Sequence, residues 1–241
     1  RGEIDLAVHS MKDVPAELPD GLFLTAYTKR EDPRDAFVGK DRKTDLDVLT
    51  EGSLIGTSSL RRQAHLTRFY PHLRAVSIRG NLETRIRKIG EMNLAGVLLA
   101  AAGLKRMELT SKISQYLSVD RFIPAVGQGV LGIEAREDDA ELYRILTVLD
   151  DDDTRTVVLA ERAFLKTLEG GCQVPIAAYA GVDGAKISLH GMVASLDGKR
   201  IIEDTLEGNR KDAVSVGETL AEFLLSRGAG EILKEVYDKM S

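Results

Sequence analysis

Two consecutive arginines, Arg61 and Arg62, follow three hydroxyl residues and carry the clearest chemical signal in the sequence. An apolar run precedes the hydroxyl residues and a helical pattern follows, so Thr57, Ser58 or Ser59 is expected to cap a helix N-terminus. The arginines then fall in the first helical turn, where the helix dipole disfavours cations. Backbone N–H groups, hydroxyls and guanidinium groups at one point indicate a carboxylate or phosphate site. The segment alone equally allows a second interpretation, in which both arginines point into solvent.

Polar and mostly basic residues also follow the other strand-like runs. Because ligands of open α/β sheets bind beyond the carboxyl ends of the strands, these residues are expected to line one anion-binding cleft. Asp13 is the carboxylate among them. It would act as a general acid or base or stabilise a cation, although a salt bridge is the commoner role of such an acid. The positions are Ser10, Lys12 and Asp13 after residues 3–9, Thr57 to Arg62 after residues 53–56, Arg79 and Arg85 after residues 74–78, and Gly103, Lys105 and Arg106 after residues 95–101.

Cys172 is the single cysteine of the chain, so no disulfide can form within it and a reducing compartment is indicated. It follows two glycines between a predicted helix and a predicted strand, which favours a reactive or ligand-bearing thiol on a loop. A small buried side chain is the more common role of a lone cysteine. The four histidines show no metal-ligand spacing, so no metal site is expected.

The elements that must position these residues follow two different patterns of secondary structure along the chain. From residue 36 to about 123, strands and helices alternate, which predicts a parallel α/β sheet with helices at 59–69 and 82–90. The run 95–101 is uniformly apolar, as in a parallel strand buried on both faces. Near the C-terminus, three strand-like runs joined by Asp-Gly pairs, with helices around them, predict a small antiparallel α+β domain.

Composition and charge exclude several classes of protein. The net charge of −5 argues against a general nucleic-acid binder. No apolar run approaches the roughly 20 residues that span a bilayer, and no signal peptide is visible. The chain starts without methionine, and its first strand has no partner before it, so we expect the C-terminal part of a longer protein.

Several short segments are each ordinary alone but highly specific together. They are His9–Pro15, Arg30–Phe37, Gly56–Arg62, Arg79–Asn81, Ala102–Arg106, Pro124–Gly129 and Leu168–Pro175. In this order, across nearly the whole chain, they resemble the hydroxymethylbilane synthase family, also called porphobilinogen deaminase. The resemblance implies a transferase of porphyrin and haem biosynthesis that joins four porphobilinogen molecules head to tail. It would release ammonia at each addition and yield hydroxymethylbilane, a linear tetrapyrrole.

The resemblance also implies the architecture. We expect an α/β protein with two domains built like periplasmic binding proteins, the first incomplete here, and a small C-terminal α+β domain with a three-stranded antiparallel sheet. Domain 1 is expected to comprise residues 1–30 and 128–150, domain 2 residues 33–123, and domain 3, which carries Cys172, residues 152–241.

The family carries a dipyrromethane cofactor joined to a cysteine by a thioether, and Cys172 matches that cysteine. Asp13 matches the catalytic aspartate, which interacts with pyrrole nitrogens and assists deamination and coupling. Each pyrrole carries two carboxylates, which arginine can bind bidentately, and a carboxylate can stabilise the cationic azafulvene left when ammonia departs. Matches to cofactor-binding positions are Ser10, Lys12, Asp13, Thr57, Ser58, Ser59, Arg61, Arg62, Arg79, Gly80, Arg85, Ala100 and Gly103, and matches to substrate-binding positions are Arg79, Arg85, Arg106 and Gln128.

One departure from the family pattern concerns the N-terminus. The family has an additional N-terminal segment with two site residues and a flexible Lys/Gly-rich loop. We therefore expect a longer chain or a separate N-terminal fragment to complete domain 1, and we assign no activity to the isolated 241-residue chain. The expected protein is a cytoplasmic monomer that binds porphobilinogen and neither nucleic acid nor membrane. The alternative is a non-catalytic two-lobed anion-binding module or sensor, which would tolerate loss of Asp13 and Cys172.

Overall fold

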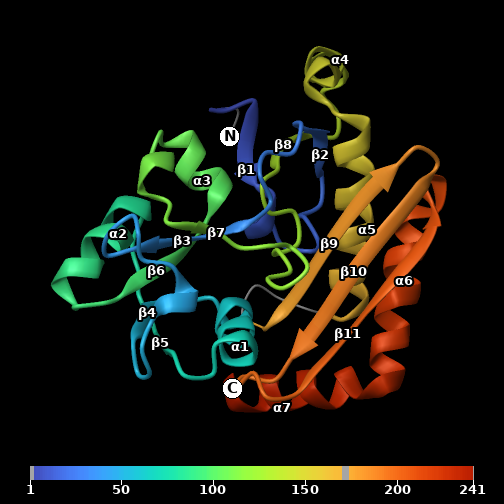
Figure 1. Ribbon diagram of the computed structural model, residues 1–241. Helices are drawn as coiled ribbons and strands as arrows, with labels where there is room; N and C mark the ends of the chain where they lie inside the picture. The colour runs from blue at the N-terminus through green and yellow to red at the C-terminus, as the bar shows by residue number, and fades with distance from the viewer. Residues whose placement is uncertain (1–2, 170–173, 241) are drawn as a thin grey trace.

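The strands form three β-sheets within residues 3–169 and 174–240, which the computed structural model describes. Figure 1 shows the three sheets around a common centre, the first at the top, the second on the left and the third on the right. The expected fold class, α/β with a C-terminal three-stranded antiparallel sheet, is confirmed.

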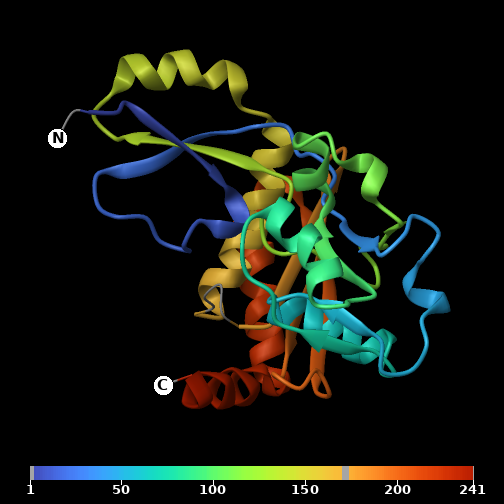
Figure 2. The ribbon, with the colours of Figure 1, turned by 90° about the vertical axis from the view of Figure 1, so that its left-hand side faces the viewer.

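The first sheet joins the start of the chain to a strand that comes much later in the sequence. Its strands, in the order β1-β8-β2, are β1 Leu6–Ser10, β8 Leu131–Arg136 and β2 Leu22–Tyr27. All pairings are antiparallel. The strand expected at 3–9 thus finds its partner downstream. Helix α4 (Ala140–Leu146) lies along this sheet (Figure 2), and its Leu146 packs against Ala26 and Ile133.

The second sheet is mixed, so the prediction of a parallel sheet is wrong for part of it. Its strands, in the order β5-β4-β6-β3-β7, are β5 Arg74–Val76, β4 Leu54–Gly56, β6 Gly96–Ala100, β3 Asp35–Gly39 and β7 Gln115–Tyr116. Strand β4 pairs with β5 and β6 in parallel, whereas β3 pairs antiparallel with β6 and β7. Strand β3 enters directly from the charged crossover 28–34, so no strand–helix–strand unit fixes its direction.

Helices cover both faces of this second sheet. They are α1 Leu60–Phe69, α2 Leu82–Glu91 and α3 Ala101–Arg106. Leu98 of β6 packs with α1 through Leu66, while its neighbours Val97 and Leu99 pack with α2 through Ile89. Because successive strand residues point to opposite faces, this alternation buries β6 on both sides, as its apolar sequence predicts.

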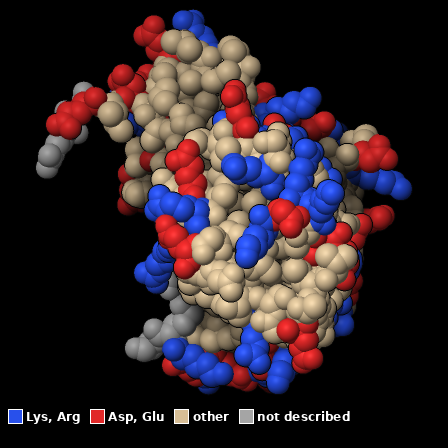
Figure 3. Space-filling model, turned by 60° about the vertical axis from the view of Figure 1, so that its left-hand side comes forward, with Lys and Arg blue, Asp and Glu red and all other residues tan. Residues whose placement is uncertain are grey.

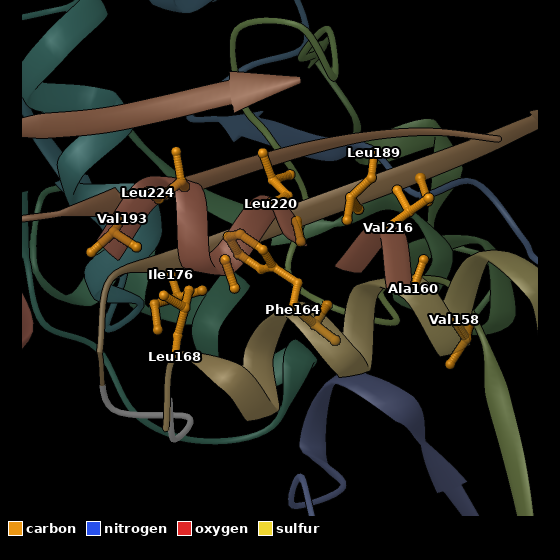
Figure 4. Packing of buried hydrophobic residues seen from close by; sticks show 14 of the residues in the cluster. Val158, Ala160, Phe164, Leu168, Ile176, Leu189, Val193, Val216, Leu220 and Leu224 are labelled. Carbon is orange, nitrogen blue, oxygen red and sulfur yellow. The ribbon is translucent and has the colours of Figure 1, made fainter. Parts of the chain in front are cut away.

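The third sheet and its helices form the C-terminal layer, as the Asp-Gly hairpin signals predict. The elements are β9 Ile176–Asp183, β10 Lys186–Ala194, β11 Ile201–Asn209, α5 Asp152–Thr167, α6 Ala213–Leu224 and α7 Gly230–Met240. The strand order is β11-β10-β9, and both pairings are antiparallel. Figure 4 shows Phe164 of α5 between Leu220 of α6 and Ile176 of β9, so the two helices cover one face of the sheet.

The core of the C-terminal layer extends into the turn that follows β1. Met11 and Val14 are buried in the same apolar cluster as Val158 and Phe164, together with Val130. Burying a side chain of this size contributes about 1.5–3 kcal/mol. The turn between Met11 and Val14, which carries Lys12 and Asp13, is therefore fixed by the C-terminal layer as well as by its own strand.

Candidate active site

A pocket of about 330 Å³ lies where the three layers meet. Its basic and polar lining comes from the turn after β1, the start of α1, helix α2 and residues 122–129, the return crossover that leads from the second sheet back to the first. Its apolar lining comes mostly from the return crossover and the C-terminal layer. The lining residues are Met11, Lys12, Asp13, Val14, Ser58, Ser59, Leu60, Arg61, Arg62, Arg85, Ala125, Val126, Gln128, Leu165, Val174 and Ile176.

The pocket brings together about half of the residues that the sequence singled out. Those that line it are Lys12, Asp13, Ser58, Ser59, Arg61, Arg62, Arg85 and Gln128. Those that do not are Ser10, Thr57, Arg79, Gly80, Ala100, Gly103, Lys105 and Arg106. Cys172 lies outside the described residues, but Val174, two residues further along the chain, lines the pocket.

Arg61 and Arg62 are buried, so the interpretation in which they point into solvent is wrong. They are 4% and 5% exposed, and both pair with the fully buried Asp35 at the start of β3. Nη1 of Arg61 lies 2.7 Å from Oδ2 of Asp35, and Nη2 of Arg62 lies 2.7 Å from Oδ1. Burial alone raises the pKa of Asp35, but the two guanidinium groups hold it well below its usual range.

Asp35 is a site residue that the sequence analysis missed. A possible signal was its place in the segment Arg30–Phe37, but its partners lie more than 20 residues away in sequence. Two guanidinium groups share this one carboxylate among the described residues. One buried positive charge is therefore left without a carboxylate from the described residues, and a buried charge needs a partner. A ligand anion would supply it.

Two further cations lie in the same positive environment. Burial lowers the pKa of Lys12, and Arg62 lowers it further, while Asp13 and Asp35 raise it. Burial and Arg62 also lower the pKa of Arg85, and Asp13 opposes them. Both shifts mean that the protonated forms are held at a cost that a bound carboxylate would offset.

Asp13 is the exposed carboxylate of the pocket. No ion pair within 4 Å joins it to a cation of the described chain, so the salt bridge considered in the sequence analysis is not seen there. Its position is set by backbone packing, because Met11, two residues before it, is buried against Gly127. Gly127 has a φ of +69°, and a Cβ added there would lie 2.6 Å from Cβ of Met11. Only glycine fits this close approach without a shift.

The hydroxyl residues before α1 shape the pocket through the backbone. Ser59 caps α1, since its side chain accepts a hydrogen bond from the Arg62 backbone N–H. Ser58 accepts a hydrogen bond from the Ile78 backbone N–H at 3.0 Å and donates one to the Ile78 carbonyl. Thr57 accepts from the Ser59 backbone N–H. Ser58 thus fastens the α1 turn to the segment between β5 and α2, and Arg85 reaches the pocket from α2.

A second buried ion pair, also missed from the sequence, ties the layers together behind the pocket. Glu161 of α5 is fully buried and accepts hydrogen bonds from both Nη atoms of Arg30, at 2.7 and 3.0 Å. It also accepts from the backbone N–H groups of Gly127 and Ala180. Arg30 in turn donates to the carbonyl of Gln128, whose side chain donates to Asp35. The sequence signal that could have revealed this ion pair is Glu161 itself, a glutamate among the apolar residues of a helix.

The basic character of the pocket is local. On the face of the molecule drawn in Figure 3, acidic side chains are interspersed with basic ones. Among the described residues no group of acids, histidines and cysteine could hold a metal ion. The described part of the chain contains no helix long and apolar enough to cross a membrane.

Two family models match the chain. One, described as porphobilinogen deaminase, dipyromethane cofactor binding domain, matches residues 1–144, and the other, porphobilinogen deaminase, C-terminal domain, matches residues 155–226. The chain belongs to the porphobilinogen deaminase family. It is 53% identical over 239 residues to porphobilinogen deaminase of Trichlorobacter lovleyi, covering 99% of this chain and 76% of the relative. It is 52% identical over 235 residues to that of Brevibacillus brevis, covering 97% and 75%.

Members of the porphobilinogen deaminase family are transferases of tetrapyrrole biosynthesis, and this is the function of the chain. It condenses four porphobilinogen molecules head to tail, with loss of ammonia, to hydroxymethylbilane, and its cofactor is dipyrromethane. The sensor alternative is not favoured. Among solved structures, a TRAP periplasmic solute-binding protein of Sulfitobacter sp. nas-14.1 aligns with this chain at 12% identity and a TM-score of 0.38. The alignment covers 97% of this chain and 78% of that protein.

The pocket residues fit the dipyrromethane of porphobilinogen deaminases. That group carries several carboxylates, and the pocket offers Lys12, Arg62 and Arg85 around a buried charge for which the described residues supply no carboxylate. Its apolar wall of Leu165 and Val174 suits the pyrrole rings.

Proposed function

We propose that this pocket holds the dipyrromethane cofactor by its carboxylates and presents it, with porphobilinogen, to Asp13. The observation that carries the proposal is the pair of buried arginines that share one carboxylate at the wall of the pocket. Lys12 and Arg85 add two cations whose pKa values are lowered by burial. Such a wall favours a ligand with several carboxylates over a neutral one.

The cofactor is proposed to be joined by a thioether to Cys172. When bound, it supplies a covalently held pyrrole to which further pyrrole units are added. Leu165 and Val174, on either side of Cys172 in sequence, support this by lining the pocket. The remaining proposed cofactor contacts are Ser10, Thr57, Ser58, Ser59, Arg61, Arg79, Gly80, Ala100 and Gly103, and the proposed substrate contacts are Arg79, Arg85, Arg106 and Gln128.

Asp13 is proposed as the catalytic residue. Positive charge develops on the substrate pyrrole as its amine leaves as ammonia, and a fixed carboxylate stabilises that charge. The carboxylate also accepts a hydrogen bond from a pyrrole N–H and so orients the ring. Burial of Met11 and Val14 holds the turn that carries Asp13, which limits the reorganisation needed during the reaction.

We further propose three domains with boundaries at 1–30 plus 128–150, 33–123 and 152–241. The sheet β1-β8-β2, the sheet β5-β4-β6-β3-β7 and the sheet β11-β10-β9 support this division. A cytoplasmic monomer without nucleic-acid or membrane partners is proposed as well. The single cysteine and the net charge of −5 support it.

The proposal is tested with Asp13→Asn in the purified holoenzyme. We expect porphobilinogen consumption to fall by about 100-fold or more, with the cofactor retained and the unfolding midpoint nearly unchanged, because Asp13 is exposed and forms no ion pair within the described chain. Asp20→Asn, another exposed aspartate outside this pocket, is the control and should leave turnover at the wild-type rate. Undiminished turnover by Asp13→Asn would overturn the catalytic assignment.

A further inference from the structure

We propose that Asp35 is a positioning residue that holds Arg61 and sets the neighbouring Arg62 in its ligand-binding orientation before any ligand arrives. The proposal rests on the function proposed above for the pocket. Asp35 is fully buried and does not line the pocket, so it can act on a ligand only through the side chains that it holds.

Each carboxylate oxygen of Asp35 accepts hydrogen bonds from one or more of the side chains of Arg61, Arg62 and Gln128. Oδ2 accepts a hydrogen bond from Nη1 of Arg61 at 2.7 Å. Oδ1 accepts from Nη2 of Arg61 at 3.2 Å, from Nε and Nη2 of Arg62 at 3.0 and 2.7 Å, and from Nε2 of Gln128 at 3.0 Å. Three side chains from two segments, the start of α1 and the residues before β8, therefore converge on one carboxylate, and the orientation of each depends on it.

The remaining hydrogen bonds leave Arg62 available to a ligand. Arg61 also donates to the Ile123 carbonyl and to the Gln128 side chain, so both of its Nη atoms are doubly used within the described residues. Arg62 also donates to the Leu98 carbonyl through Nη1, and each of its Nη atoms thus makes one bond there. Because a guanidinium group has two N–H groups on each Nη atom, Arg62 keeps two for a carboxylate. Asp35 and Leu98 fix the plane of that group.

Two roles for Asp35 predict opposite results when its charge is removed. If Asp35 only reduces the positive charge of the pocket, Asp35→Asn strengthens binding of anionic substrate. If it positions Arg61 and Arg62, the amide offers one oxygen in place of two and turns an N–H group toward a guanidinium. Misplacement by about 1 Å can cost about 100-fold in rate.

The test is steady-state turnover of porphobilinogen by the Asp35→Asn holoenzyme, expressed per folded molecule from a urea titration. We expect KM to rise about tenfold and kcat/KM to fall about 100-fold. Asp150→Asn is the matched control, since Asp150 also accepts from an arginine, Arg155, but lies outside the pocket. It should lose stability and keep kcat/KM. An unchanged or lower KM in Asp35→Asn contradicts the positioning role.

A measurement on the wild-type protein keeps the proposal testable if Asp35→Asn does not fold. Nitrogen-15 spectra of the arginine side chains, recorded before porphobilinogen is added, should show slow rotation of the Arg62 guanidinium and fast averaging for Arg144, an exposed arginine outside the pocket. Fast averaging of Arg62 would refute preorganisation. The Arg62→Gln variant separates the proposed pocket function from the proposed role of Asp35. An unchanged KM for porphobilinogen in this variant refutes the pocket function itself. A raised KM there with an unchanged KM in Asp35→Asn refutes only the role of Asp35.

Discussion

Replacing Glu161 with glutamine is expected to destabilise the protein by about 3–5 kcal/mol. The carboxylate accepts four hydrogen bonds, two from Arg30 and one each from the backbone N–H groups of Gly127 and Ala180. Glutamine offers one acceptor oxygen and places an NH₂ group against the remaining donors. Breaking a buried ion pair costs about 3–5 kcal/mol, and the unsatisfied N–H groups are part of that cost.

The exposed pair between Arg68 and Glu203 provides a matched comparison. It has the same two-bond geometry, with contacts of 2.6 and 2.8 Å, but its side chains are 36% and 30% exposed. Water already compensates much of that charge, so Glu203→Gln should cost about 1 kcal/mol or less. Burial rather than geometry is therefore predicted to separate the two variants.

The assay is urea unfolding of both variants and the wild type, at low temperature and fixed pH. Globular proteins of this kind have stabilities of about 5–15 kcal/mol, so Glu161→Gln is expected to remain folded in dilute buffer while unfolding at much lower urea. Equal losses of unfolding free energy in the two variants would refute the reasoning, since they would show that burial of the Arg30 pair adds nothing.

Three further predictions concern the surroundings of the pocket. Burial lowers the pKa of His65 from 6.5 in the unfolded chain to about 3 in the folded protein. The unfolded state therefore binds a proton first as the pH falls, so the free energy of unfolding is highest above pH 6.5 and decreases from pH 6.5 toward 3. Urea unfolding from pH 7 to 4 should show a loss of up to about 1.4 kcal/mol per pH unit that is absent in His65→Leu; the same slope in both would contradict it. Gly127→Ala should cost about 2–4 kcal/mol, because φ is +69° and the added Cβ meets Met11, and a melting curve like that of the wild type would disprove the close approach. Ser59→Ala should remove the cap of α1 and cost about 1 kcal/mol in urea unfolding, whereas Ser59→Asp, which keeps a cap, should recover most of the loss.

Local features of the fold were predictable from the sequence. The Ser59 cap, the hairpins at Asp183-Gly184 and Asp197-Gly198 and the buried strand 95–101 depend on neighbouring residues, and the structure places each of them near the predicted positions. The direction of β3 depends instead on how a crossover enters a sheet, and the expectation of a parallel sheet was wrong there.

The site could be predicted only in part for the same reason. Arg61 and Arg62 were recognised from their unfavourable place in a helix, but Asp35 was not, because its relation to them exists only when β3 lies beside β6. The pair of Arg30 and Glu161 likewise joins segments that are far apart in sequence. Arg79 and Arg106 remain proposed contacts that do not line the pocket.

The intact mass of the purified protein tests the central claim most directly, namely that the pocket beside Asp13 serves a dipyrromethane joined to Cys172. The account predicts the sequence mass plus two linked pyrrole units, and the bare sequence mass for Cys172→Ser. A wild-type protein with an unmodified thiol and no consumption of porphobilinogen would contradict it.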